Sequence, residues 1–337
     1  MIGKREARYC NLKLLLTFLV VYGHMIEKRI GQSPGLLAQY RWIYAVHMPL
    51  FVFLSGLFLK EETRCLRQGR RMLLLYLCLQ APIALFSGGG VSLWRPYWHL
   101  WYLLSLSCWS YLAWLWLRLE RRFPRLRSSW VRVGLVVWAL GAACGVGFVP
   151  WVGRGLSLSR TVVFLPFFLC GLFCPRELPW RRLRLLGLGG LALAAAGFFL
   201  RGREIPTALF YQAEGYGGLG AQGAALRLLT LLMGAGLSLF LLTFVPERRQ
   251  PFSKLGTDTM GCYLLHAPLV LALRAIPLPD WSLGVVSMGV VCVLYKALQW
   301  RLPLYAVTEG RERDDGLSGN LSGVRRAGVP LSPEAQR

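Results

Sequence analysis

The sequence predicts an all-α integral membrane protein of about ten transmembrane helices. Of the 337 residues, 55% are hydrophobic and only 16% are charged, whereas soluble domains carry about a quarter charged residues. The apolar residues form runs close to the roughly 20 residues that cross a bilayer as a helix, with short Arg-rich connections between them. The net charge of +23 does not predict nucleic-acid binding, because the arginines fill the gaps between apolar runs instead of forming a polar surface.

Ten apolar runs account for these helices, taken in order along the chain. The first, residues 12–31, follows Lys4, Arg5 and Arg8 as a signal peptide would, but it continues through Tyr22 and His24 without a small-residue cleavage site, so we expect a retained helix. The sixth and seventh runs are the shortest, and prolines predict kinks in the second, third, sixth and ninth. The later runs are 41–59, 71–87, 98–118, 132–150, 160–174, 185–200, 225–245, 258–277 and 281–300.

Lysine and arginine are distributed unevenly between the two sides of these runs. With the N-terminus inside, 28 of the 39 fall on the inner side and 10 on the outer side, and Lys296 lies within the last run. Cytoplasmic loops are enriched in both residues, so the bias predicts two cytoplasmic termini and an even number of spans. Residues 1–302 form the predicted membrane domain, and residues 303–337, rich in Gly, Ser, Arg and Asp, are predicted to be a disordered cytoplasmic tail. The nine cysteines form no CxxC pair, so we expect no metal site.

All four histidines lie in or at the edge of a predicted span, where an ionisable side chain costs at least about 2.5 to 3.5 kcal/mol. His24 is roughly 18 Å from the inner end of the first helix, and His47 is roughly 9 Å from the outer end of the second. In a hydrocarbon core of about 30 Å these depths nearly coincide, so we expect both imidazoles in one cavity in the outer half of the membrane. His99 and His266 lie in the fourth and ninth runs, and simple packing is the alternative for any one of the four.

Lys13, His24 and Glu27 are predicted to share one helix face. Eleven residues separate Lys13 from His24, which is three turns plus about 20° and a rise of about 16 Å. Glu27 follows three residues after His24, where it can orient the imidazole or increase its basicity. The alternative for Lys13 and Glu27 is snorkelling to the two interfaces, which does not account for His24.

Two segments carry a recognisable pattern. Residues 11–24, NLKLLLTFLVVYGH, hold Lys13, ten further residues and His24, and residues 43–56 read IYAVHMPLFVFLSG. The first resembles the opening helix of the membrane acyltransferase 3 family, with Lys13 in place of the commoner Arg, and the second is most similar to the fucose 4-O-acetylase-like branch of that family. Weaker matches follow at residues 100–103, 159–171 and 263–266. The resemblance extends from about residue 9 to 300 and implies ten spans with both ends inside.

The resemblance implies an O-acyltransferase that passes an acyl group, usually acetyl from acetyl-CoA, to a carbohydrate hydroxyl, with His24 catalytic. Imidazole suits a base that takes the hydroxyl proton near neutral pH, and the oxyanion of the thioester then needs a donor, for which His47 and Arg160 are candidates. Transfer is either direct or through an acylated histidine. Arg67, Arg70 and Arg71, in a predicted loop, are candidates for the phosphates of the donor, and Lys13 for its inner part. The alternative for these arginines is that they bind no ligand and only follow the general enrichment of Lys and Arg on the cytoplasmic side.

The carbohydrate acceptor is expected on the outer side, where His99, Trp101 and Tyr102 lie among other aromatic residues. Aromatic rings also line any membrane interface, which is the alternative reading of this group. We therefore expect a multi-pass enzyme of the plasma membrane whose partners are the acyl-CoA donor, the acceptor and the bilayer. A transporter or flippase for a lipid-linked sugar or small solute, with the buried histidines as a proton relay, is the competing hypothesis. A non-catalytic sensor on the same scaffold is a third.

Overall fold

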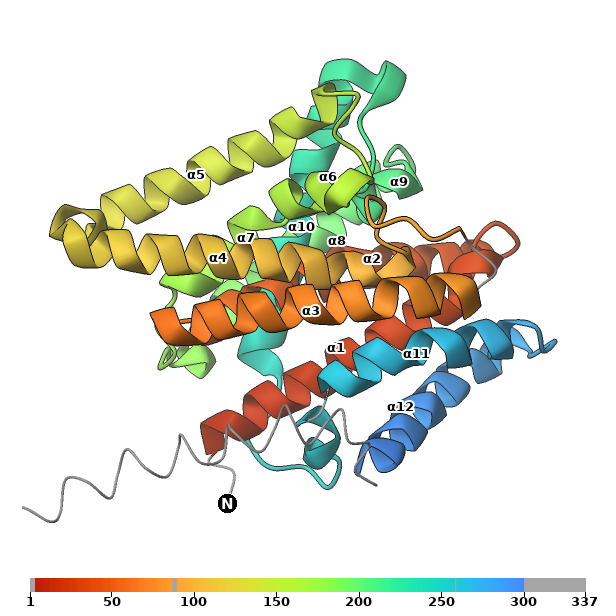
Figure 1. Ribbon diagram of the computed structural model, residues 1–337. Helices are drawn as coiled ribbons and strands as arrows, with labels where there is room; N and C mark the ends of the chain where they lie inside the picture. The colour runs from red at the N-terminus through yellow and green to blue at the C-terminus, as the bar shows by residue number, and fades with distance from the viewer. Residues whose placement is uncertain (1–3, 87–89, 258, 300–337) are drawn as a thin grey trace, which may run out of the picture.

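The computed structural model describes residues 4–86, 90–257 and 259–299. In these residues every regular element is a helix, and the chain forms a bundle (Figure 1). The predicted tail, residues 303–337, lies outside the described residues. The α-helices are α1 (Lys4–Ile26), α2 (Pro34–Phe58), α3 (Glu62–Phe86), α4 (Trp101–Arg122), α5 (Ser129–Gly145), α6 (Leu158–Val163), α7 (Leu165–Phe173), α8 (Arg184–Arg201), α9 (Thr207–Tyr211), α10 (Gly220–Phe244), α11 (Thr259–Arg274) and α12 (Leu283–Gln299).

Each predicted apolar run overlaps one of these helices or a helix pair. Within the described residues, eight helical segments are long and apolar enough to cross a membrane, and counting the bent pair α6 and α7 as one span gives nine. The pair bends by 54°, and Pro166 lies in the first turn of α7, where its missing N–H and fixed φ favour a new helix start. The ninth predicted run corresponds to α11, which has only 16 residues and is shorter than a full crossing.

The beginning of α1 and the end of α12 lie at the same end of the bundle. Near its start α1 contacts the turn before α11, because the backbone of Gly256 packs against that of Cys10. At the other end of α1, the loop that follows the helix contacts the loop between α11 and α12. There Arg29 Nη1 lies 3.2 Å from Asp280 Oδ1. Thus α11 runs parallel to α1 and α12 returns beside them (Figure 1). The placement of both termini on the cytoplasmic side stays a prediction.

Helix α3 begins nine residues earlier than the predicted run of 71–87. The predicted loop with Arg67, Arg70 and Arg71 is helical from Glu62 onward, because the segment holds good helix formers and places an acidic residue in the first turn. Hydropathy detects only the part of a helix inside the hydrocarbon, so it missed this polar extension. The three arginines therefore lie within little more than one turn of a helix and not in a loop.

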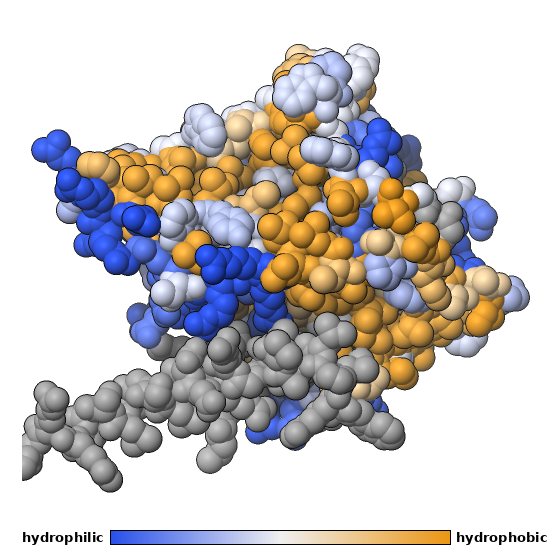
Figure 2. Space-filling model, in the orientation of Figure 1, coloured by the Kyte–Doolittle hydropathy of each residue, from blue (hydrophilic) through white to orange (hydrophobic). Residues whose placement is uncertain are grey.

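The surface combines an apolar belt with charged ends. Figure 2 shows hydrophobic residues along α3, α4 and α5, with hydrophilic patches over the first turns of α3 and where α4 meets α5. Large apolar side chains such as Trp138 and Phe199 are 64% and 91% exposed. A protein in water would bury such residues, whereas lipid solvates them. The exposed apolar belt identifies an all-α multi-pass membrane protein.

Helices α2 and α7 cross in very close contact at two glycines. A Cβ atom added at Gly56 would overlap the carbonyl oxygen of Phe168, and one added at Gly171 would overlap that of Phe53. Small residues let helix backbones approach in this way inside membranes. Because α7 continues from α6, this crossing sets the position of α6 relative to α2.

Replacing Gly171 by Ala is expected to lower the stability of the folded protein by about 1 to 3 kcal/mol, because the added methyl group forces the α2–α7 crossing apart. The measurement is thermal unfolding of the purified protein in detergent. Gly189→Ala on α8 is the control, since nothing lies within 4 Å of a Cβ at that position. Equal unfolding temperatures for the two variants would contradict a tight crossing.

Candidate functional site

The four histidines converge from four helical segments at one end of the bundle. The ring of His24 on α1 stacks on that of His266 on α11, with centroids 5.3 Å apart and an interplanar angle of 13°. His99, at the start of α4, meets His266 edge-on at 5.0 Å. His47 on α2 lines the same cavity as His24 and His99. The cavity shared by His24 and His47 follows the expectation from their depths.

His24 is held by contacts on both its side chain and its backbone. Its Nδ1 lies 3.3 Å from the hydroxyl of Tyr44 and 3.7 Å from Glu27 Oε2. Arg274, at the end of α11, donates from Nε to the carbonyl oxygen of His24 at 2.9 Å and from Nη2 to Glu27 Oε2 at 2.8 Å. The guanidinium also lies 4.9 Å from the ring centre of Trp98. Arg274 thus fixes both the end of α1 and the carboxylate beside the imidazole.

The carboxylate of Glu27 favours a proton on Nδ1 of His24. Nε2 then keeps its lone pair, and no hydrogen bond to it from another side chain occurs among residues 4–86, 90–257 and 259–299. The indole of Trp98 packs at 4.4 Å from the imidazole centre. His24 therefore combines a supported Nδ1 with a free Nε2 at the cavity, which is the arrangement of a general base.

His47 is oriented differently. Its Nδ1 lies 2.7 Å from the carbonyl oxygen of Ile43, one turn earlier in α2, so the ring donates its proton to that oxygen. A neutral imidazole in this tautomer presents only an acceptor at Nε2. This argues against the predicted use of His47 as a hydrogen-bond donor to an oxyanion.

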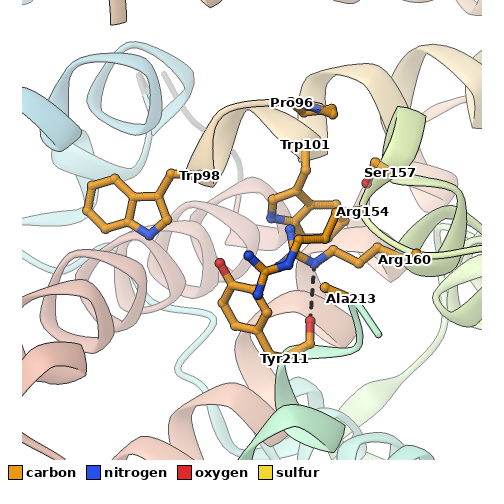
Figure 3. A pocket seen from close by; sticks show the side chains of 9 residues that line it. Pro96, Trp98, Trp101, Arg154, Ser157, Arg160, Tyr211 and Ala213 are labelled. Carbon is orange, nitrogen blue, oxygen red and sulfur yellow. Dashed lines mark hydrogen bonds between the residues drawn. The ribbon is translucent and has the colours of Figure 1, made fainter. Parts of the chain in front are cut away.

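The space around these residues consists of two adjoining cavities. The inner one is lined by His24, Tyr44, His47 and His99. The outer one is lined by Pro96, Gly153 and Arg154. Four side chains line both cavities and so mark their junction: Trp98, Trp101, Arg160 and Tyr211. Figure 3 shows these four around the outer cavity.

Arg160 on α6 is 7% exposed at this junction. Its Nε donates to the carbonyl oxygen of Tyr211 at 3.1 Å (Figure 3). Its Cζ lies 4.8 Å from the ring centre of Trp101 and 4.1 Å from that of Tyr211. Two aromatic rings and one carbonyl therefore hold the guanidinium in place.

The backbone around the junction is strained. Trp98, Ser157 and Gln212 have φ of 34°, 57° and 59°, a left-handed conformation that L side chains rarely adopt. Each costs about 1 to 3 kcal/mol, and each lies at or next to the lining of the outer cavity. Compensating hydrogen bonds hold two of them, because Ser159 Oγ donates to the carbonyl oxygen of Gln212 at 2.9 Å and Ser105 Oγ donates to Ser157 Oγ at 3.2 Å.

His99 has a hydrogen-bonding capacity that the protein does not use. The residue is 1% exposed, and neither ring nitrogen has a partner among the described residues. His266, 0% exposed, donates from Nδ1 to the carbonyl oxygen of Tyr263 at 2.6 Å, and its Nε2 has no partner in the same set. Buried polar atoms nearly always find partners, and His99 lines the inner cavity whereas His266 does not, so the nitrogens of His99 mark this cavity as a place for a polar ligand.

Trp101 and Tyr102 were predicted together but separate in the structure. Trp101 lines both cavities, whereas Tyr102 lines neither and shares a 2.6 Å hydrogen bond with Ser55 on α2. Neighbouring residues on a helix point about 100° apart, so only one of the two faces the cavity. Tyr102 packs α4 against α2 instead.

The predicted cations lie toward the other end of α1 and on α3. Lys13 Nζ lies 5.2 Å from the ring centre of Phe58 at the end of α2. His24 contacts Tyr44 in the first half of the same helix. Both side chains therefore project toward α2. Arg67 and Arg70 are exposed, and Arg71 is half-buried. All three belong to the first turns of α3, where Figure 2 shows a hydrophilic patch.

Lys60, in the turn between α2 and α3, has a structural role at this end. Its Nζ donates at 2.9 Å to the carbonyl oxygens of Gly171 and Cys174 at the end of α7. Burial lowers the pKa of this ammonium group to about 8. Lys60 is therefore engaged with helix carbonyls, and Arg67 and Arg70 of α3 are exposed at the same end of the bundle.

No cluster of three or more His, Cys, Asp or Glu able to hold a metal ion occurs in residues 4–86, 90–257 and 259–299. The nine cysteines all lie within this part of the chain, and none of them forms a disulfide. The polar groups described around the cavities are imidazole, hydroxyl, guanidinium and the Glu27 carboxylate.

Several site residues were not identified from the sequence. Tyr44 touches His24, and Arg274, counted only as an outer-side charge, touches its backbone. Trp98 was expected among the aromatic residues of the acceptor side, but its contact with His24 was not. His266 was noted as an intramembrane histidine without a role. A charged residue at the end of a span, as Arg274 is, was the one signal available for finding this contact.

Comparison with known proteins gives one match. A family model described as an acyltransferase domain matches residues 10–296, which include every residue of the two cavities. No curated protein and no solved structure matches the chain.

Proposed function

We propose that this chain, which belongs to the acyltransferase 3 family, transfers an acetyl group from acetyl-CoA to a hydroxyl of an extracytoplasmic or lipid-linked carbohydrate. Family membership makes it a membrane acyltransferase. The observation that carries the finer proposal is the free Nε2 of His24 at an inner cavity that adjoins an outer one. A plasma-membrane location follows from an acceptor on the outer side and a donor from the cytoplasm. The segment of residues 43–56 supports the fucose 4-O-acetylase-like branch.

In this mechanism His24 acts as the general base. Its Nε2 takes the proton of the carbohydrate hydroxyl while the hydroxyl oxygen attacks the thioester carbonyl. The new C–O bond forms, the C–S bond breaks, and the proton passes from His24 to the leaving thiolate. Glu27 and the Tyr44 hydroxyl hold Nδ1 and so keep Nε2 available.

The oxyanion of the tetrahedral intermediate needs an N–H donor. His47 and Arg160 were the candidates from the sequence, but the N–H of His47 is engaged with Ile43 and Arg160 lies at the junction toward the outer cavity. His99 lines the inner cavity and not the outer one. Its ring nitrogens have no hydrogen-bond partner among the described residues, so its N–H is available. We assign the oxyanion to His99, which was predicted to bind substrate.

The acyl donor is proposed to enter from the opposite end of α1. The phosphates of CoA suit the exposed Arg67 and Arg70 with the half-buried Arg71, because guanidinium groups bind phosphate through two oxygens. The Lys13 ammonium lies about 16 Å along α1 from His24, which is comparable to an extended pantetheine arm. Lys13 then steadies the inner part of the donor while His24 meets the thioester.

Glu27 and Arg274 are expected to act as one unit on His24. Glu27→Gln and Arg274→Gln are each expected to lower kcat about tenfold with little change in KM, because a charge-assisted hydrogen bond contributes about 1.5 to 3 kcal/mol. The double variant is expected to lose little more than either single one. A double-mutant cycle on acetyl transfer measures this, and fully additive losses would refute the shared role.

The experiment that tests the function uses inverted membrane vesicles, which expose the cytoplasmic face to radiolabelled acetyl-CoA. Vesicles with the protein are expected to accumulate base-labile label on lumenal carbohydrate, and vesicles without it are not. The bend between α6 and α7 is also a feature of transporters. Movement of a labelled solute without any acetyl transfer would favour the transporter instead.

A further inference from the structure

Arg160 is a buried cation whose charge the protein does not neutralise. Its side chain forms no ion pair with a carboxylate in the described parts of the chain. Two carboxylates of this part of the molecule are engaged elsewhere, since Glu214 lies 2.6 Å from Arg154 Nη2 and Glu27 lies 2.8 Å from Arg274 Nη2. A buried charge without a partner is costly, and cation–π contacts offset only part of that cost.

The contacts of Arg160 leave one edge of the guanidinium open. Trp101 and Tyr211 cover it with their rings, and the Nε edge is bound to the carbonyl oxygen of Tyr211. The remaining edge carries both Nη groups in one plane. This fork matches two oxygens of a carboxylate or phosphate.

The position of Arg160 indicates that its Nη edge binds the acceptor and not the donor. Arg160 lines both cavities, whereas His24 lines only the inner one. A molecule entering through the outer cavity meets Trp98, Trp101 and Tyr211 at the same junction. Aromatic faces bind sugar rings, and the guanidinium between them adds a fixed positive charge (Figure 3).

We infer that the acceptor is an anionic carbohydrate, whose carboxylate or phosphate is bound by the Nη edge of Arg160 while its hydroxyl reaches His24. This inference rests on the proposed acyl transfer, because only that reaction makes the bound carbohydrate an acceptor. Binding of the carbohydrate involves no reaction, so it can be measured without the acyl donor.

The test is equilibrium binding of three glycosides that share one ring to the full-length protein in lipid nanodiscs, without acetyl-CoA. The probes are methyl glucoside, methyl glucuronide and methyl glucoside 6-phosphate, so that the last two distinguish a carboxylate from a phosphate. At least one anionic probe is expected to bind about ten- to a hundredfold more tightly than the neutral one, which is the range for a hydrogen bond between charged groups.

Arg160→Gln is expected to abolish this preference, and Arg160→Lys, which keeps the charge without the fork, to retain part of it. Arg201→Gln is the control, because Arg201 is a 57% exposed outer-side arginine paired with Glu204, and it should leave the preference intact. Equal binding of all three probes, no measurable binding of any, or a preference that survives Arg160→Gln would overturn the inference. Acetyl transfer that occurs while the preference is absent would overturn the inference and leave the proposed function standing.

Discussion

His24→Ala is expected to lower the rate of acetyl transfer about 100- to 10,000-fold, the range that a positioned general base contributes. The reason is that, among the described residues that line the cavity, His24 is the imidazole whose Nδ1 lies beside a carboxylate while its Nε2 stays available. His47 also presents an acceptor nitrogen to the cavity, but no carboxylate accompanies its Nδ1, which is bound to the Ile43 carbonyl. The measurement is kcat with saturating acetyl-CoA in vesicles that contain equal amounts of each variant.

The control for His24→Ala is Tyr22→Phe, two residues earlier on α1. Its hydroxyl lies 2.5 Å from Gln39 Oε1, away from the cavity, so this variant should keep full activity. The unfolding temperatures of both variants are measured as well, because the His24 ring packs against Tyr44, Trp98 and His266, and a loss of activity must be separated from a loss of stability. Retention of activity in His24→Ala would remove His24 as the base.

His99→Phe is expected to lower kcat about 100- to 1,000-fold with KM for acetyl-CoA unchanged, as the loss of one oxyanion donor does. Phe fills a similar space but has no N–H. His99→Asn keeps an N–H donor and should recover part of the loss. The split between kcat and KM and the recovery by Asn distinguish a catalytic donor from a packing residue.

Two results would contradict that role for His99. A variant that raises KM and spares kcat would return His99 to the predicted role in substrate binding. Equal loss in the Phe and Asn variants together with lower thermal stability would make it a packing residue.

The membrane-crossing helices could be predicted from the sequence, because a helix that crosses the bilayer needs an apolar run of membrane length. The start of α3 at Glu62 could not, since its first turns are polar and lie beyond the run. The close crossing of Gly56 and Gly171 was also invisible, because it depends on which helices become neighbours. Pro166 indicated a bend in the sixth run, and its size, 54°, depends on packing.

The meeting of His24 and His47 could be predicted because both lie on consecutive helices whose depths follow from residue counts. The contact of Arg274 with His24 could not, because 250 residues separate them and no local pattern links them. The same holds for the ring stack of His24 with His266. Tyr102 was assigned to the site with Trp101 because adjacency in sequence was treated as adjacency in space, which a helix does not preserve.

Acyl transfer between the two adjoining cavities is expected to depend on His24. The most direct measurement compares inverted vesicles carrying wild-type protein or His24→Ala, supplied with radiolabelled acetyl-CoA, and counts O-acetyl label on lumenal carbohydrate. We expect base-labile label with the wild type and none above background with the variant. Equal labelling by the two proteins would contradict the claim.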